Sequence, residues 1–130
     1  MTSSFELGRV LILENDYGNR ILFADYLEHC GYTVSTLADG QQVFARLQSF
    51  QPDVLILNLR MPVVDGFTII EQIRRESCWQ NIAILVVSGY TLATDQHKAY
   101  RLGANAYLTK PVLPSDLSDT VARLVNSPNP

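Results

Sequence analysis

The chain has 130 residues, of which 47% are apolar and 18% are charged, and its formal net charge at pH 7 is −3. This length suits a single domain, and the composition is that of a globular protein, not a disordered one. So mild a negative charge argues against nucleic acid or an anionic membrane as the main binding partner.

Short apolar runs alternate along the chain with longer stretches in which apolar residues recur at helical spacing. In chain order, the predicted elements are strand 10–13, helix 17–29, strand 33–36, helix 40–47, strand 54–57, helix 67–76, strand 82–87, helix 95–102, strand 106–108 and helix 114–125. Unbroken apolar strands are typical of a sheet buried on both faces. The alternation therefore predicts one α/β domain of the (βα)₅ type, with a parallel sheet between two layers of helices.

Cysteine usage and the distribution of apolar residues indicate the compartment. Cys30 and Cys78 are too few and too far apart for a disulfide scaffold, so we expect free thiols. Residues 1–8 lack the basic and apolar regions of a signal peptide, and the longest apolar run, residues 82–87, is too short to span a bilayer. We expect a cytoplasmic protein without membrane contact.

Polar side chains follow four of the five predicted strands at the point where each strand ends. They are Glu14, Asn15 and Asp16 after the first strand, Asn58 after the third, Ser88 after the fourth, and Thr109 and Lys110 after the fifth, where Pro111 comes next. Ligands of open parallel sheets bind at the carboxyl ends of the strands. The sequence therefore predicts a site at this edge, built from acids, amides, a hydroxyl and a lysine.

Four segments in this order resemble the receiver domain of two-component response regulators. They are residues 10–16, 52–66, 86–89 and 103–111, and the strongest are PDVLILNLRMPVVDG at 52–66 and YLTKP at 107–111. The resemblance covers residues 9–125, which leaves 1–8 as an N-terminal extension and 126–130 as a tail or linker stub. It implies a flavodoxin-like, doubly wound parallel sheet of five strands in the order 2-1-3-4-5.

The resemblance also implies a chemistry. In such receivers, two acidic residues after the first strand and one at the end of the third hold Mg²⁺, which prefers oxygen ligands. The third-strand aspartate accepts a phosphoryl group, whose charge the metal and a lysine neutralise. A hydroxyl residue after the fourth strand and an aromatic residue in the fifth then change conformation.

The acidic positions of this chain depart from the family pattern. Glu14 matches the first acidic position, Asn15 the second, and Asn58 the phosphoryl acceptor itself. Asp16 lies next to the pair but is expected to cap the first helix. Mg²⁺ binding through Glu14, Asn15 and Asn58 is therefore expected to be weak at most, and no other cofactor is expected.

The other positions of the motif match the family. Ser88 corresponds to the switch hydroxyl, Tyr107 to the switch aromatic and Lys110 to the phosphate-sensing lysine, and the Lys110–Pro111 peptide is expected to be cis. We therefore expect an atypical receiver that is not phosphorylated at Asn58 and serves as a protein-interaction module. It has no catalytic residues and is not expected to be an enzyme.

Two alternatives remain open at this stage. An ordinary receiver could use Asp53 or Asp65 as acceptor, although one precedes the third strand and the other follows it by several residues. A flavodoxin-like binder of a small ligand fits the fold, but the acidic loop after the first strand would repel a phosphate. A hydrolase is not favoured, because Ser88 has no evident histidine partner.

Expected partners are other signalling proteins, either a histidine kinase or a downstream effector, with no direct contact to nucleic acid. Relatives that dimerise through charged contacts often carry two acids just before the switch aromatic. Asn105 and Ala106 occupy those positions here. We therefore expect a monomer or a weak dimer.

Overall fold

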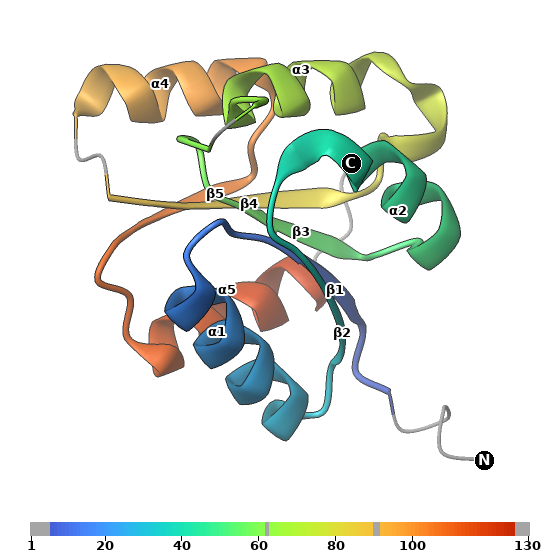
Figure 1. Cartoon of the computed structure of the whole chain (residues 1–130), viewed down its shortest axis with the longest axis vertical. Coiled ribbons are helices and arrows are strands. Elements are labelled where there is room, and N and C mark those ends of the chain that lie inside the picture. The colour runs from blue at the N-terminus through green and yellow to red at the C-terminus, as the bar shows by residue number, and fades with distance from the viewer. Residues whose placement is uncertain (1–5, 62, 90–91, 127–130) are drawn as a thin grey trace.

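A parallel sheet of five strands forms the centre of the computed structural model, which describes residues 6–61, 63–89 and 92–126 (Figure 1). The strands are β1 (Arg9–Leu13), β2 (Thr33–Leu37), β3 (Val54–Leu57), β4 (Ala83–Ser88) and β5 (Ala106–Thr109). The α-helices are α1 (Tyr17–Cys30), α2 (Val43–Phe50), α3 (Gly66–Arg75), α4 (Ala93–Leu102) and α5 (Pro114–Asn126). Two short 3₁₀ helices are η2 (Gly40–Gln42) and η3 (Ser77–Trp79).

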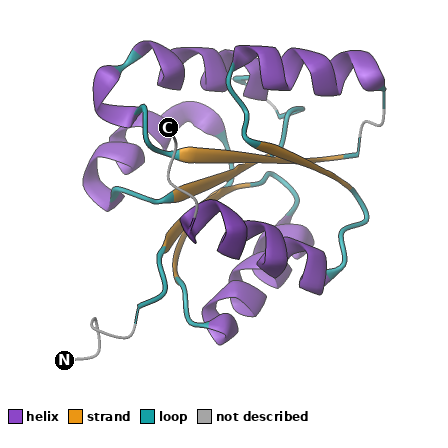
Figure 2. Ribbon diagram, turned by 180° about the vertical axis from the view of Figure 1, so that it is seen from behind, coloured by secondary structure: helices purple, strands orange, loops and turns teal. Residues whose placement is uncertain are grey.

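The strands lie in the order β2-β1-β3-β4-β5, and every neighbouring pair is parallel. Helices α1 and α5 cover one face of the sheet, and α2, α3 and α4 cover the other (Figure 1). Figure 2 shows the same layers from behind. The predicted fold class and strand order are confirmed.

The alternation of side chains along each strand divides the core into two layers. On β1, Leu11 and Leu13 pack with α2, α3 and α4, whereas Val10 and Ile12 pack with α1 and α5. All four side chains are fully buried. This is why the central strands are unbroken apolar runs in the sequence.

The sequence prediction was wrong about the region 40–47, where it expected one helix. The structure has the 3₁₀ turn η2 followed by α2, which continues to Phe50. The Asp39 carboxylate accepts the backbone N–H of Gln41 at 2.9 Å and so favours a separate tight turn. α2 ends at Gln51, which adopts the left-handed conformation with φ 55°.

The described part of the N-terminal extension runs beside the sheet. The Gly8 carbonyl accepts the N–H of Thr33 at 2.9 Å, and the Leu7 N–H donates to the carbonyl of Gly31 at 3.2 Å. Residues 1–5, Pro62, Tyr90, Thr91 and residues 127–130 of the predicted tail lie outside the described residues. Both cysteines are free thiols, as expected. None of the helices in the described ranges has the length and apolar character needed to cross a bilayer.

Gly66 lets helix α3 start directly against the end of β3. Its N–H donates to the Leu59 carbonyl at 2.7 Å. A Cβ at position 66 would lie 2.8 Å from the Asn58 carbonyl oxygen and 2.8 Å from Leu59 Cα. Both atoms belong to the backbone, so the clash could be relieved only by moving the segment that carries Asn58.

We therefore expect Gly66→Ala to lower the free energy of unfolding by about 1–3 kcal/mol, the usual cost of overpacking. Gly89→Ala is the matched control, because a Cβ there meets no atom within 4 Å. The control should change stability by no more than about 0.5–1 kcal/mol, and in the stabilising direction. Urea denaturation of both variants measures the difference, and equal stabilities would contradict the close approach.

Candidate functional site

The polar residues predicted to gather at the carboxyl edge of the sheet follow strands that are in register there. Leu13 pairs with Leu57, and Ser88 pairs with Thr109. The Asn58 N–H donates to the Leu13 carbonyl at 3.1 Å, and the Lys110 N–H donates to the Ser88 carbonyl at 2.8 Å. The backbone ladder therefore continues past the strand ends and places the predicted site residues next to one another.

Glu14 is the most deeply buried charged residue of the site, with 2% of its surface exposed. Its Oε1 accepts a hydrogen bond from Lys110 Nζ at 2.8 Å, in an ion pair. Its Oε2 accepts the N–H of Asp16 at 2.9 Å and lies 3.4 Å from Asn58 Nδ2. A buried carboxylate requires such partners because its desolvation is costly.

Asn58 contributes a hydrogen-bond donor where a carboxylate could only accept. Its Nδ2 donates to Asn15 Oδ1 at 2.9 Å, and Asn58 is 8% exposed. An aspartate at the same position would face the Glu14 carboxylate and the Asn15 carbonyl with no proton to share. The amides therefore fit a pocket that holds one carboxylate and one ammonium group.

Asp16 faces away from this cluster. Its Oδ2 accepts the N–H of Asn19 at 2.8 Å, so it is the N-cap of α1, as the sequence indicated. Arg20 was missed by the sequence analysis. Its guanidinium donates to the Glu14 carbonyl at 2.9 Å and lies 5.5 Å from the Tyr17 ring centroid. A contact to a backbone carbonyl leaves no residue pattern that would have predicted it.

Ser88 is a hydrogen-bonding neighbour of the Tyr107 hydroxyl and affects its pKa. Burial raises the pKa of the Tyr107 hydroxyl above its usual 10.0, and Asp95 raises this pKa too, whereas the bond to Ser88 and the charge of Arg60 lower it. Ser88 is fully buried. The hydroxyl of Tyr107 is therefore directed toward the end of β4.

The Lys110–Pro111 peptide is cis in the structure. The same segment continues from β5, whose last residue, Thr109, pairs with Ser88. The Lys110 side chain is 20% exposed, against 2% for its partner Glu14.

The comparison with protein families identifies the fold. A model of the response regulator receiver domain matches residues 10–122. The chain belongs to this family. Receiver domains are signalling modules of two-component systems, so the match also favours this class over a flavodoxin-like binder of small ligands.

Proteins of similar sequence are longer than this receiver. It is 35% identical over 115 residues to protein RcaC of Microchaete diplosiphon, which covers 88% of this chain and 18% of the relative. It is 34% identical over 116 residues to the DNA-binding dual master transcriptional regulator RpaA of a Synechocystis strain, covering 89% of this chain and 47% of that protein. The receiver thus spans less than half of these relatives.

Solved structures have the same architecture. The chemotaxis protein CheY4 of Vibrio cholerae is 30% identical with a TM-score of 0.84, over 89% of this chain and 97% of that one. The receiver domain of sensor histidine kinase PA1611 from Pseudomonas aeruginosa is 26% identical with a TM-score of 0.84, over 92% and 98% of the two chains. That structure has a magnesium ion coordinated in its active-site cleft.

The residues of this receiver do not fit the metal that the family implies. Of the three expected carboxylates only Glu14 is present, and both of its oxygens are already hydrogen-bonded. Lys110 supplies a positive charge beside it at 2.8 Å. Across residues 6–61, 63–89 and 92–126, no three His, Cys, Asp or Glu side chains form a group that could hold a metal ion.

The ion pair at the centre of the site leads to a stability prediction. We expect Lys110→Met to lower the free energy of unfolding by roughly 2–4 kcal/mol, because it leaves a buried carboxylate without its cation. Adding Glu14→Gln should recover part of that loss, with a coupling of at least about 1 kcal/mol.

Lys98→Met is the control for removing a lysine, since Lys98 contacts only the Phe67 ring among the interactions described, at 4.5 Å. It should cost at most about 1 kcal/mol. The double-mutant cycle consists of the unchanged protein, Lys110→Met, Glu14→Gln and the double variant. Chemical denaturation of these four proteins and of the control gives the coupling energy between positions 110 and 14. Additive effects of the two substitutions would contradict a direct ion pair.

Proposed function

We infer that this receiver is not phosphorylated at Asn58 and acts as a protein-interaction module of two-component signalling. The observation that carries the inference is the amide of Asn58 at the end of β3, bonded to Asn15 and beside Glu14. A neutral amide is not a nucleophile toward phosphorus at neutral pH and cannot form an acyl phosphate.

The positions of the other nearby acids support the same reading. The Asp53 carboxylate accepts the N–H of Arg9 at 2.8 Å, at the start of β1 and therefore at the opposite edge of the sheet. The Asp65 carboxylate accepts the N–H of Thr68 at 3.0 Å and caps α3. Both are engaged in backbone contacts, which argues against either as a substitute acceptor.

Internal contacts take the place that metal and phosphoryl group hold in other receivers. Lys110 is paired with Glu14, and Ser88 is a hydrogen-bonding neighbour of Tyr107. The lysine and the hydroxyl that would respond to a phosphoryl group therefore already have partners within the domain. This favours one conformation that is set without phosphate, or one that a protein partner changes.

Four exposed apolar side chains toward the carboxyl edge, here called the apolar rim, support a protein partner. The rim consists of Tyr17, Val63, Leu92 and Leu113, which are 64–72% exposed. Each lies in a segment that follows one of the strands β1, β3, β4 or β5, so all four lie toward the carboxyl edge. Exposed apolar side chains gathered at one functional edge are typical of a binding surface.

The partner we propose is another signalling protein, a histidine kinase or a downstream effector, and the domain itself is proposed to be a monomer or a weak dimer. The relative RpaA is named as a DNA-binding regulator, and this receiver matches 47% of its length. We propose no direct contact between this receiver domain and nucleic acid, since its net charge is −3.

The first test is phosphotransfer. Incubation with acetyl phosphate and Mg²⁺ should leave the intact mass of the natural sequence unchanged, because no carboxylate stands at the acceptor position. The variant Asn15→Asp with Asn58→Asp restores both missing carboxylates with little change in size, and it should gain one hydroxylamine-sensitive phosphoryl group.

The same pair of proteins should differ in thermal melting. Mg²⁺ at millimolar concentration should raise the melting temperature of the double variant, because it binds only the folded state and relieves repulsion among three carboxylates. An equal rise in the natural sequence, or a phosphoryl group on it, would overturn the proposal.

A second test concerns the apolar rim. We expect Tyr17→Ser with Leu113→Ser to weaken capture of the partner from cell extract at least roughly tenfold, as for loss of interface anchors. Leu7→Ser is the matched control, because Leu7 is 56% exposed but precedes β1 at the amino edge. Quantitative mass spectrometry of captured proteins measures both, and equal capture by the rim variant would argue against this surface.

A further inference from the structure

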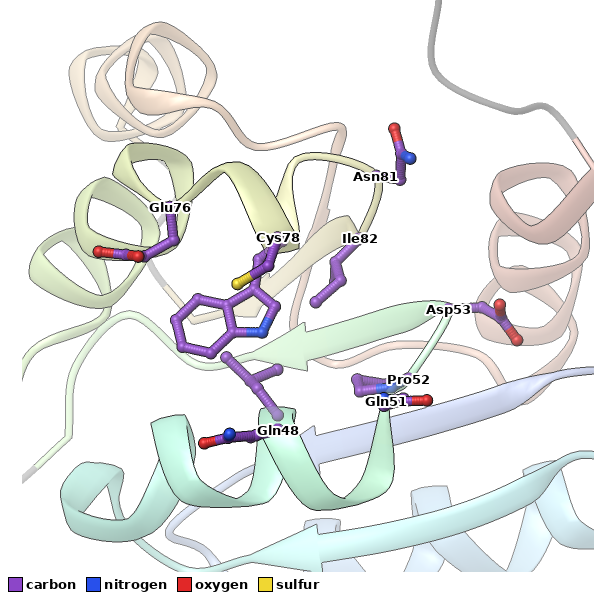
Figure 3. Close-up of a pocket in the computed structure, with 10 residues that line it drawn as sticks. Gln48, Gln51, Pro52, Asp53, Glu76, Cys78, Asn81 and Ile82 are labelled. Atoms are coloured by element: carbon purple, nitrogen blue, oxygen red, sulfur yellow. The ribbon is translucent and has the colours of Figure 1, made fainter.

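A pocket of about 560 Å³ opens at the amino edge of the sheet, between the end of α2 and η3 (Figure 3). Pro52 and Asp53 precede β3, and Ile82 precedes β4, so the pocket lies at the end of the sheet opposite Asn58. Nothing in the function proposed above uses it.

Trp79 gives this pocket a rigid aromatic wall. Its ring stacks on Phe44, with centroids 5.7 Å apart and an angle of 27° between the planes. Arg74 donates to the Trp79 carbonyl at 3.3 Å, to Gly103 at 3.0 Å and to Asn105 at 2.8 Å, which ties η3 to the segment before β5. The indole is therefore held in place before any ligand binds.

Most of the remaining lining is apolar or amide-bearing. Leu47, Pro52 and Ile82 supply apolar surface, and Gln48 and Asn81 supply amides. None of the described lining residues is basic. Asp53 and Glu76 lie at opposite ends of the pocket in Figure 3, with their carboxylates directed outward.

Such a surface fits an extended, proline-containing segment without charged side chains. Prolines in polyproline II conformation dock against aromatic-lined grooves at little entropic cost. The free carbonyls of such a segment accept hydrogen bonds from side-chain amides of the kind that Gln48 and Asn81 present. A phosphate or another anion would find no cationic partner here.

The chain carries such a segment directly after α5. Residues 127–130 read Ser-Pro-Asn-Pro and lie outside the described residues. The end of α5 is close to the pocket. A Cβ placed on Gly8 would lie 3.4 Å from Val125 Cγ1 and 3.3 Å from Asp53 Oδ2, so Gly8 lies between these two residues. Asp53 is also part of the pocket lining.

The segment is short and the pocket is large enough for part of it. Four residues in polyproline II conformation span about 12 Å, and the pocket has a volume of about 560 Å³. We propose that the pocket beside Trp79 binds the proline-containing segment 127–130 of the same chain. The contact sets the direction in which the polypeptide leaves α5.

Trp79 is the single tryptophan of the chain, so the tryptophan fluorescence reports on the surroundings of this one indole. Removing residues 127–130 should shift the emission of Trp79 to longer wavelength and increase its quenching by acrylamide. The full-length variant Pro128→Ser with Pro130→Ser should produce the same change. Removing residues 2–4 is the matched control for loss of a terminus and should leave both signals unchanged.

Thermal melts of every variant report whether the fold is retained, and the double proline variant tests the proposal without shortening the chain. Emission and quenching that are the same in the natural sequence, the truncated chain and the proline variant would overturn it. So would a difference that appears only as protein concentration is raised, since the pocket would then take the segment of a second copy.

Discussion

The ion pair between Lys110 and Glu14 spans the carboxyl edge of the sheet, from the end of β5 to the end of β1, at 2.8 Å. Glu14 is buried, so its charge is tolerated only with a cation and further donors around it. Asn58 and the backbone of Asp16 are those donors. The arrangement of the pocket therefore depends on one carboxylate and on the groups that satisfy it.

The amides of Asn15 and Asn58 also affect the charge balance of the pocket. Three carboxylates in one pocket would repel each other without a bound cation, whereas one carboxylate with one lysine is neutral by itself. Asn58 and Asn15 can also bond to each other, because an amide both donates and accepts. In physical terms, the charges of this pocket are balanced by its own side chains. This is the basis on which we propose a receiver that works through protein contacts.

The two edges of the sheet have different surfaces. The carboxyl edge combines the neutral polar pocket with an exposed apolar rim, and the amino edge has a pocket with an aromatic wall. Helix α5 runs between them: it starts at Pro114, shortly after Lys110, and in its last turn Val125 lies beside Gly8.

The sequence by itself determined the α/β class and the identity of the residues at the carboxyl edge, because apolar runs, helical periodicity and short motifs are local properties of the chain. The strand order followed from the resemblance of these motifs to receiver domains. The sequence also indicated that Asp16 would cap α1. Only the tertiary structure decided which distant groups come together: Arg20 on the Glu14 carbonyl, Arg74 on Asn105, and Trp79 and Pro52 in the lining of one pocket. Such contacts join residues by side-chain reach and packing, and these depend on the assembled sheet and its helices, not on any spacing along the chain.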